Sequence, residues 1–234
     1  MRYHLLLLLL AGPVLGFGQP TGAPGRNYTD ILDKGNNIVA FDLHEDHVRG
    51  SPFLSSAWTP AQVLLVGNRQ PQLAPVKYDA ARQQLRVRRP QGDSVIVPAS
   101  QLQEFLLNPG PQSRRFVRLA SAGVPEGFAE VLSPGPHLQL LKQWVKAVEE
   151  APAASSGYAA ASTTRVYVDR PKYYLRTPNG QLTAFRLKRA SLQEALASYP
   201  AALQALKTSK GSLNSEAELQ AAIAALDPLV MPSP

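Results

Sequence analysis

The segment Val76-Lys77-Tyr78-Asp79-Ala80-Ala81-Arg82-Gln83-Gln84-Leu85-Arg86-Val87-Arg88 decides the fold class of most of this chain. In its second half, apolar Leu85 and Val87 alternate with arginines. A period of two places such residues on opposite faces of a β-strand. Since the polar link 79–83 separates this run from another short apolar run, the segment predicts a β-hairpin.

Short strand candidates of the same kind continue on both sides of this hairpin. Gly, Pro or Asn residues bound them, as is typical of β-rich proteins. The turn Thr177-Pro178-Asn179-Gly180 joins the last two, because Asn-Gly tolerates the positive φ of tight hairpin turns. These predicted strands cover residues 38–43, 62–66, 94–97, 102–107, 115–119, 128–132, 165–168, 172–176 and 181–188.

Residues 138–149 fit two patterns. Leu138, Leu141 and Val145 have helical spacing, whereas alternate apolar positions from Leu138 onward fit one face of a long strand. The preceding Ser133-Pro134-Gly135-Pro136 is a tight turn. We expect the chain to return beside the strand before that turn, which favours a strand over a helix.

The pattern changes from strands to helices after the last predicted strand. Ser191 with Glu194, and Ser215 with Glu218, match the capping box of a helix start, and Pro200 suits a first helical position. Apolar residues then recur at helical spacing, namely Leu192, Leu196, Leu203, Leu206, Leu219, Ile223 and Leu226. The order of elements predicts an α+β fold. We expect an antiparallel β-meander (a curled sheet, sandwich or partial barrel) followed by two or three short C-terminal helices.

The first 18 residues have the pattern of a signal peptide. One fixed positive charge, at Arg2, precedes the leucines 5–10, and Gly16 and Gly18 are small residues suited to cleavage before Gln19. The apolar run is shorter than the roughly 20 residues of a membrane-spanning helix, and no later segment is long and apolar enough. We therefore expect export to the periplasm or the extracellular space.

The expected mature chain has one domain. A flexible lead-in precedes it, because Gly, Pro and Asn are frequent there. With no cysteine in the sequence, thiol catalysis is excluded and the core must form without disulfides. The predicted organisation is a signal peptide at 1–18, a lead-in at 19–36 and a single domain at 37–230, with the meander at 37–189 and the helical part at 190–230.

Basic residues on several predicted strands are the candidate binding residues. The formal net charge is +7, and Arg2 would leave with the signal peptide. If the strands are neighbours, one sheet face carries a positive stripe that could hold an acidic glycan or anionic lipid headgroups. Solvated outer strand faces are the competing interpretation, and export argues against nucleic acid. The candidates are Arg86, Arg88, Lys142, Lys146, Arg186 and Lys188.

His44 and His47 are the candidate metal ligands. Imidazole nitrogen binds zinc or copper, and Asp42 lies nearby in the sequence. However, positions i and i+3 face opposite sides of a strand, and the sequence is not His-Glu-x-x-His. A solvated turn is therefore the competing interpretation, and we expect no cofactor.

Catalytic motifs are absent from the sequence. There is no Gly-x-Ser-x-Gly nucleophile elbow, and no spacing selects a carboxylate pair for glycoside hydrolysis. We therefore expect a non-catalytic, envelope-associated binding or structural protein. A hydrolase that acts on envelope polymers is the alternative, because the separation of two carboxylates depends on the fold.

Several short segments carry a resemblance to a known group of proteins. They include Gly50-Ser51-Pro52-Phe53-Leu54, Trp58, Lys77-Tyr78-Asp79 and Tyr173-Tyr174-Leu175, followed by helices. In this order the chain resembles uncharacterised secreted β-rich proteins of Gram-negative bacteria. The resemblance implies an exported β-rich domain with a helical tail, and it assigns no site residues.

Overall fold

A computed structural model describes residues 38–39, 48–90, 92–151 and 165–230. The predicted signal peptide and lead-in, most of the predicted strand 38–43, and both candidate metal ligands lie outside these residues. The strands are β1 (Ile38–Val39), β2 (Val48–Arg49), β3 (Thr59–Leu65), β4 (Gln72–Asp79), β5 (Gln84–Arg88), β6 (Ser94–Val97), β7 (Leu102–Leu107), β8 (Arg114–Leu119), β9 (Gly127–Pro134), β10 (Gln139–Gln143), β11 (Lys146–Glu150), β12 (Arg165–Asp169), β13 (Lys172–Arg176) and β14 (Leu182–Phe185). The helices are η1 (Ala99–Gln101), α2 (Arg189–Ala195), α3 (Pro200–Thr208), α4 (Glu216–Leu226) and η2 (Asp227–Leu229).

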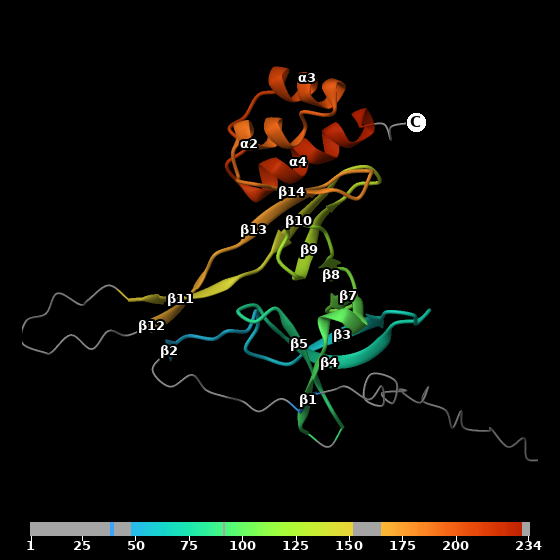
Figure 1. Cartoon of the computed structure of the whole chain (residues 1–234), viewed down its shortest axis with the longest axis vertical. Coiled ribbons are helices and arrows are strands. Elements are labelled where there is room, and N and C mark those ends of the chain that lie inside the picture. Colours follow the sequence, from blue (N-terminus) through green and yellow to red (C-terminus); the bar gives the residue numbers. More distant parts are fainter. Residues whose placement is uncertain (1–37, 40–47, 91, 152–164, 231–234) are drawn as a thin grey trace, which may run out of the picture.

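One open antiparallel sheet of 11 strands dominates the molecule (Figure 1), in the order β1-β6-β5-β4-β3-β7-β8-β9-β10-β13-β14. Strand β3 pairs with β4 on one side and with β7 on the other. The chain therefore runs outward from β3 to β6, returns through η1, and starts a second run from β7. The predicted α+β fold with a meander and C-terminal helices is confirmed.

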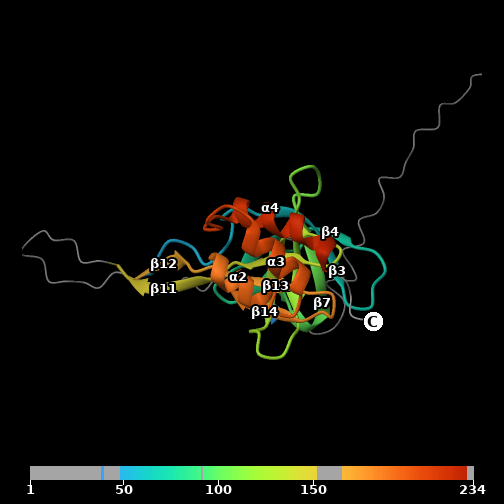
Figure 2. The same ribbon diagram turned by 90° about the horizontal axis from the view of Figure 1, so that it is seen from above.

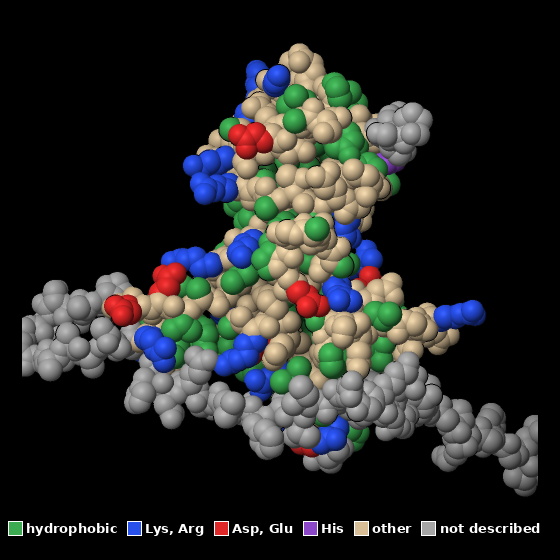
Figure 3. Space-filling view, viewed as in Figure 1, with side chains coloured by type: hydrophobic (Ala, Val, Ile, Leu, Met, Phe, Trp, Pro, Cys, Tyr) green, Lys and Arg blue, Asp and Glu red, His purple; other side chains and the backbone are tan. Residues whose placement is uncertain are grey.

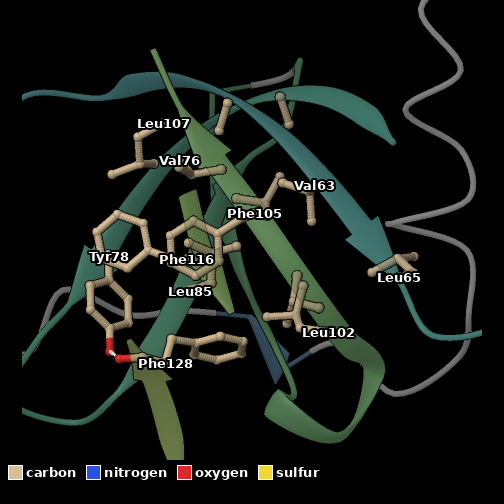
Figure 4. Close-up of a cluster of buried hydrophobic side chains, with 14 of the residues drawn as sticks. Val63, Leu65, Val76, Tyr78, Leu85, Leu102, Phe105, Leu107, Phe116 and Phe128 are labelled. Atoms are coloured by element: carbon tan, nitrogen blue, oxygen red, sulfur yellow. Dashed lines mark hydrogen bonds between the residues drawn. The ribbon is translucent and has the colours of Figure 1, made fainter. Parts of the chain in front are cut away.

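The first half of the sheet curls around its own core. Tyr78 lies on β4 and Phe128 on β9, with three strands between them. In a flat sheet, strands four positions apart would be about 19 Å from each other. The Tyr78 hydroxyl nevertheless donates a hydrogen bond to the Phe128 carbonyl at 3.3 Å, as Figure 4 shows. Of the predicted alternatives, a curled open sheet is therefore the one observed.

Aromatic rings fill this curl, which we call the sheet core. Phe105 and Phe116 stack with ring centroids 4.8 Å apart, and Tyr78 packs beside them (Figure 4). The predicted alternation in the first hairpin is confirmed, because Leu85 and Val87 are fully buried. The sheet core comprises Ala61, Val63, Leu65, Ala74, Val76, Tyr78, Ala80, Leu85, Val87, Val95, Val97, Leu102, Phe105, Leu107, Phe116 and Phe128.

The ambiguous segment 138–149 forms strands, as predicted, but two of them in different sheets. Strand β10 continues the large sheet, and the chain leaves it at Trp144 and Val145. Strand β11 then pairs with β12, which also pairs with β2 in a three-stranded sheet. Figure 2 shows β11 and β12 projecting sideways from the body of the molecule.

The three α-helices cover one end of the large sheet, and their buried residues form a helical core with it (Figures 1 and 2). Helix α2 contacts β14, and α4 contacts β9 and β10. The helical core comprises Leu138, Leu140, Tyr173, Leu175, Phe185, Leu192, Leu196, Ala202, Leu206, Leu213, Leu219, Ile223, Leu226 and Val230. The apolar positions predicted on the helices are thus mostly buried against the sheet and against one another.

Two of the three helix starts follow the sequence pattern. Pro200 is the first residue of α3, and Ser215 caps α4 by accepting the Glu218 N–H at 3.3 Å. The capping box expected at Ser191 is wrong, because α2 begins earlier, at Arg189. The Ser191 hydroxyl oxygen instead accepts the N–H of Arg186 at 3.1 Å, so it serves the end of strand β14.

A single carboxylate fixes the β9–β10 turn to the helical end. Asp227, which is buried, follows α4 and accepts the backbone N–H groups of His137 and Leu138 at 3.0 and 2.5 Å. A Cβ at Gly135 would collide with this carboxylate and with the Leu138 carbonyl. The close approach therefore requires glycine at position 135. Among the residues that the structure describes, no helix is long and apolar enough to cross a membrane.

Candidate binding site

A pocket of about 660 Å³ lies where β13, β14 and α2 meet. Its walls include the apolar side chains of Pro171, Tyr173, Phe185, Leu187 and Ala190. Lys172, Arg186, Lys188 and Glu194 also line it, and all four are exposed. Basic side chains accordingly gather at the edge of the helical end, on the left of Figure 3.

The hairpin register brings the basic residues of the pocket together. Tyr173 on β13 pairs with Phe185 on β14, so one step further along the ladder Lys172 lies opposite Arg186. Lys188 follows two residues later and is the N-cap of α2. Because the Arg186 N–H is held by Ser191 of α2, the end of the strand and the start of the helix are fixed relative to each other.

The cations of this pocket differ from the nine described Lys and Arg residues that form ion pairs. Within the described parts of the chain, none of the ion pairs includes Lys172, Arg186 or Lys188. Three positive groups therefore surround a pocket with one carboxylate, that of Glu194. Positive charges that converge without a partner raise the local concentration of anions.

The other predicted binding residues are engaged elsewhere. Arg86 is buried, lies 3.9 Å from the Asp79 carboxylate, and stacks over the ring of Phe53. Arg88 is exposed and lies over the ring of Trp58, with 5.9 Å between the guanidinium carbon and the ring centroid. These two arginines therefore help to hold segment 53–58 on the outer face of β4 and β5.

The two predicted lysines also make internal contacts. The Lys142 ammonium lies 3.7 Å from the Trp144 ring centroid and 2.5 Å from the Glu216 carboxylate. Lys146 pairs with Asp169 at 3.3 Å. Strands β5 and β10 are separated by five other strands. The six candidates therefore fall into separate groups, and only Arg186 and Lys188 share a pocket.

Two residues of the pocket were missed by the sequence reasoning. The sequence pattern predicts Lys172 at the start of a strand and does not indicate it as a binding residue. A signal existed, because a tight turn at Asn179 and Gly180 fixes the register and so sets Lys172 opposite Arg186. Glu194 was assigned to a capping box, and no sequence pattern indicated that it would line a pocket.

Among the described residues, the arrangement of His, Asp and Glu side chains gives little indication of metal binding or catalysis. No group of three or more His, Asp or Glu residues among them converges on a possible metal site. The buried carboxylates Asp79, Glu130 and Asp227 each accept hydrogen bonds from neighbouring backbone or arginine donors. The metal site predicted at His44 and His47 lies outside the described residues. It stays a prediction that melting with and without zinc would check.

Comparison with protein-family models, with curated proteins and with solved structures gives no match to this chain. The site must therefore be understood from its own chemistry. That chemistry is an apolar pocket bordered by three cations, two of them in the set expected from the sequence.

Proposed function

We propose that this protein is an exported, non-catalytic binding protein of the cell envelope. Its binding site is the pocket between β13, β14 and α2, and its ligand carries an anionic group. The observation that carries this proposal is that Lys172, Arg186 and Lys188 line one pocket and have no ion-pair partner among the described residues. Ligand pockets typically combine apolar walls with a few converging polar groups, which describes this one.

The chemistry shared by the two expected ligands is a phosphate, sulfate or carboxylate group. Such a group can come from an acidic glycan or from an anionic lipid. Arg186 offers paired N–H donors that match the oxygens of these groups, and the two lysines add point charges. The interaction should weaken as salt concentration rises, because all three cations are exposed.

Hydrolysis of an envelope polymer is the alternative, and the pocket gives it less support. A glycosidase of the usual kind needs two carboxylates across one cleft. Among the residues that the structure describes, Glu194 is the one carboxylate that lines the pocket. Incubation with purified peptidoglycan followed by a reducing-end assay distinguishes the two, since release of reducing ends would contradict a purely binding role.

Charge reversal tests the proposed site. We expect the Arg186→Glu/Lys188→Glu variant to bind dextran sulfate or phosphatidylglycerol vesicles at least about tenfold more weakly, a change of about 1.4 kcal/mol. Uncharged dextran and phosphatidylcholine vesicles are the neutral probes. The anionic probe that binds identifies the source of the ligand group.

The matched control changes the net charge equally at a distance from the pocket. Arg69 and Arg165 are exposed and do not line the pocket, so Arg69→Glu/Arg165→Glu should bind nearly as the parent does. An equal loss in both double variants would contradict the proposal, because it would indicate attraction by overall charge alone.

Export has its own test. Protein produced in an exporting Gram-negative host should begin at Gln19 or within about two residues of it, since cleavage rules are loose. Intact-mass measurement of the envelope fraction decides this. A species that retains Met1 would contradict cleavage.

A further inference from the structure

The pocket combines an apolar floor with a cationic rim, and this combination narrows the class of ligand. Tyr173, Phe185 and Leu187 pack in or against the helical core, whereas the three cations that line the same pocket are exposed. We propose that the pocket takes a single-chain anionic amphiphile, with its alkyl chain on this floor and its headgroup at the cations. This inference rests on the proposed anion-binding function and names its ligand class.

The polar groups of the floor are already occupied. The Tyr173 hydroxyl donates to the Glu216 carboxylate at 2.5 Å, and the Ser191 oxygen accepts the Arg186 N–H. A sugar ring would bring several hydroxyl groups to a surface with few partners for them. Burying hydroxyl groups without hydrogen bonds is unfavourable, whereas burying an alkyl chain there is favourable.

The size of the pocket fits this class. Its volume of about 660 Å³ lies within the range of roughly 300–1,000 Å³ that is usual for small-molecule sites. Because the three cations are exposed, a charged headgroup beside them can remain hydrated while the chain is buried. Lys172, Arg186 and Lys188 would then contact the headgroup from different directions.

A second apolar groove provides the internal comparison. It lies between α3 and α4, has a volume of about 390 Å³, and is lined largely by alanine and leucine. Its charged residues are Lys210 and Glu218, which together carry no net charge. Glu218 also accepts the Asn214 N–H at 2.9 Å. The groove could hold a chain, but nothing in it selects an anion, so the headgroup chemistry favours the pocket at β14.

A series of alkyl phosphates of increasing chain length measures separately what the headgroup and the alkyl chain contribute to affinity. The probes are inorganic phosphate and butyl, hexyl, octyl and decyl phosphate below their micelle concentrations, with octyl glucoside as the neutral counterpart. Isothermal titration of the mature protein should show binding that tightens about fourfold for each added methylene, the equivalent of about 0.8 kcal/mol. The increase should stop when the chain fills the pocket.

Filling the pocket with a larger side chain should remove the dependence of affinity on alkyl-chain length. The attraction of the headgroup to the three cations should remain. Ala190 is exposed, lines the pocket and lies on the first turn of α2. We expect Ala190→Phe to bind octyl phosphate no more tightly than inorganic phosphate. Ala224→Phe is the control, because Ala224 is exposed on α4 and lines neither cavity.

A third variant tests where the alkyl chain of the ligand binds. Ala225→Phe fills the groove between α3 and α4, and it should leave the series unchanged. If Ala225→Phe abolished the increase of affinity with chain length and Ala190→Phe did not, the inference would be overturned, since the alkyl chain would then lie in that groove. Parent protein that binds all phosphates equally would also overturn it, while leaving anion binding intact. If no phosphate binds and the charge-reversal test also shows no loss, the proposed function itself fails.

Discussion

The sheet core and the helical core bury apolar residues by different means. Every member of the sheet core lies between residues 61 and 128, and the sheet covers them by curling on itself. The helical core draws on residues from 138 to 230, and nine of its fourteen members are leucines. A curled sheet can thus complete its own core, whereas the flatter end of the same sheet depends on helices that follow it in the chain.

A partly buried chain of hydrogen bonds connects β4 of the sheet core with β10 and β13, which contribute to the helical core. Gln83 accepts the Tyr78 hydroxyl at 2.6 Å and the side-chain amide of Gln143 at 3.0 Å. Gln143 in turn accepts the Tyr174 hydroxyl at 3.1 Å. The Gln83 amide also donates to the Trp144 carbonyl at 2.7 Å, where the chain leaves the large sheet. This link suggests that the two regions unfold together, and the following variants test that expectation.

Removal of residues 191–234 should have the largest effect. It uncovers Leu138, Leu140 and Leu175, which are fully buried, and each such side chain contributes roughly 1.5–3 kcal/mol. Since a domain is stable by only about 5–15 kcal/mol, we expect an aggregating or unfolded remnant. Size-exclusion chromatography and circular dichroism measure this. A soluble remnant that melts at the parent's temperature would show that the sheet is independent of the helices.

Truncation of one residue in each core compares them directly. Phe116 and Leu219 are both fully buried. Phe116→Ala should cost about 3–5 kcal/mol and Leu219→Ala about 2–5 kcal/mol, because each leaves a cavity. Urea unfolding followed by fluorescence and by circular dichroism should give one coincident transition for each variant. Separate transitions would indicate that the cores unfold independently.

Loss of the Gln83 side chain should have an intermediate effect. Gln83→Ala removes the hydrogen bonds to the Gln143 amide and the Trp144 carbonyl, which costs about 2–3 kcal/mol, while the Tyr78 hydroxyl keeps its bond to the Phe128 carbonyl. Gln83 has a φ of +56°, a conformation that glycine adopts more readily. Gln83→Gly should therefore be more stable than Gln83→Ala by about 0.5–1 kcal/mol. The reverse order would mean that backbone strain at this position is unimportant.

Glu216 should show the smallest effect and the clearest pH dependence. Burial raises the pKa of its carboxyl group, but hydrogen bonds from Lys142 and Tyr173 and the Lys142 charge outweigh burial and hold the pKa below its usual value. A lowered pKa means stability that is present above the usual value near 4.5 and is lost as pH falls through the folded-state pKa.

We therefore expect Glu216→Gln to cost about 1 kcal/mol at pH 7, because the pair is partly exposed. The difference in melting temperature between parent and variant should shrink as the pH is lowered below 4.5. Glu194→Gln is the control, since Glu194 is exposed on another helix and does not pair with the sheet lysine. A constant difference across this pH range would contradict the role of the Glu216 charge.

Local sequence patterns predicted the elements better than their assembly. The alternation at Leu85 and Val87 and the caps at Pro200 and Ser215 depend on neighbours in the sequence. The local pattern is therefore sufficient to predict them. The capping box at Ser191 failed because the N–H of Arg186, just after β14, takes the same hydroxyl oxygen. Sheet order is a property of tertiary packing, and it separated the candidate basic residues that had been expected to lie side by side.

The candidate site was predicted in part for the same reason. Arg186 and Lys188 came from the alternation on a single strand. Lys172 and Glu194 join them only through the hairpin register and the first turns of α2. A sequence can indicate that a residue is exposed and charged, but the absence of an ion-pair partner depends on which strands become neighbours.

The chain contains two tryptophans, and they lie at two different places around the sheet core. Trp58 lies on the outer face of the sheet that surrounds the sheet core, near the cations of Lys77 and Arg88. Trp144 packs against the sheet core at the point where the chain leaves the large sheet, and its indole N–H donates to the Glu130 carboxylate at 2.6 Å. Trp58→Phe and Trp144→Phe would each leave a single emitter. The emission of the two variants could therefore be used to time, in a stopped-flow experiment, the release of segment 53–58 separately from the opening of the sheet at Trp144.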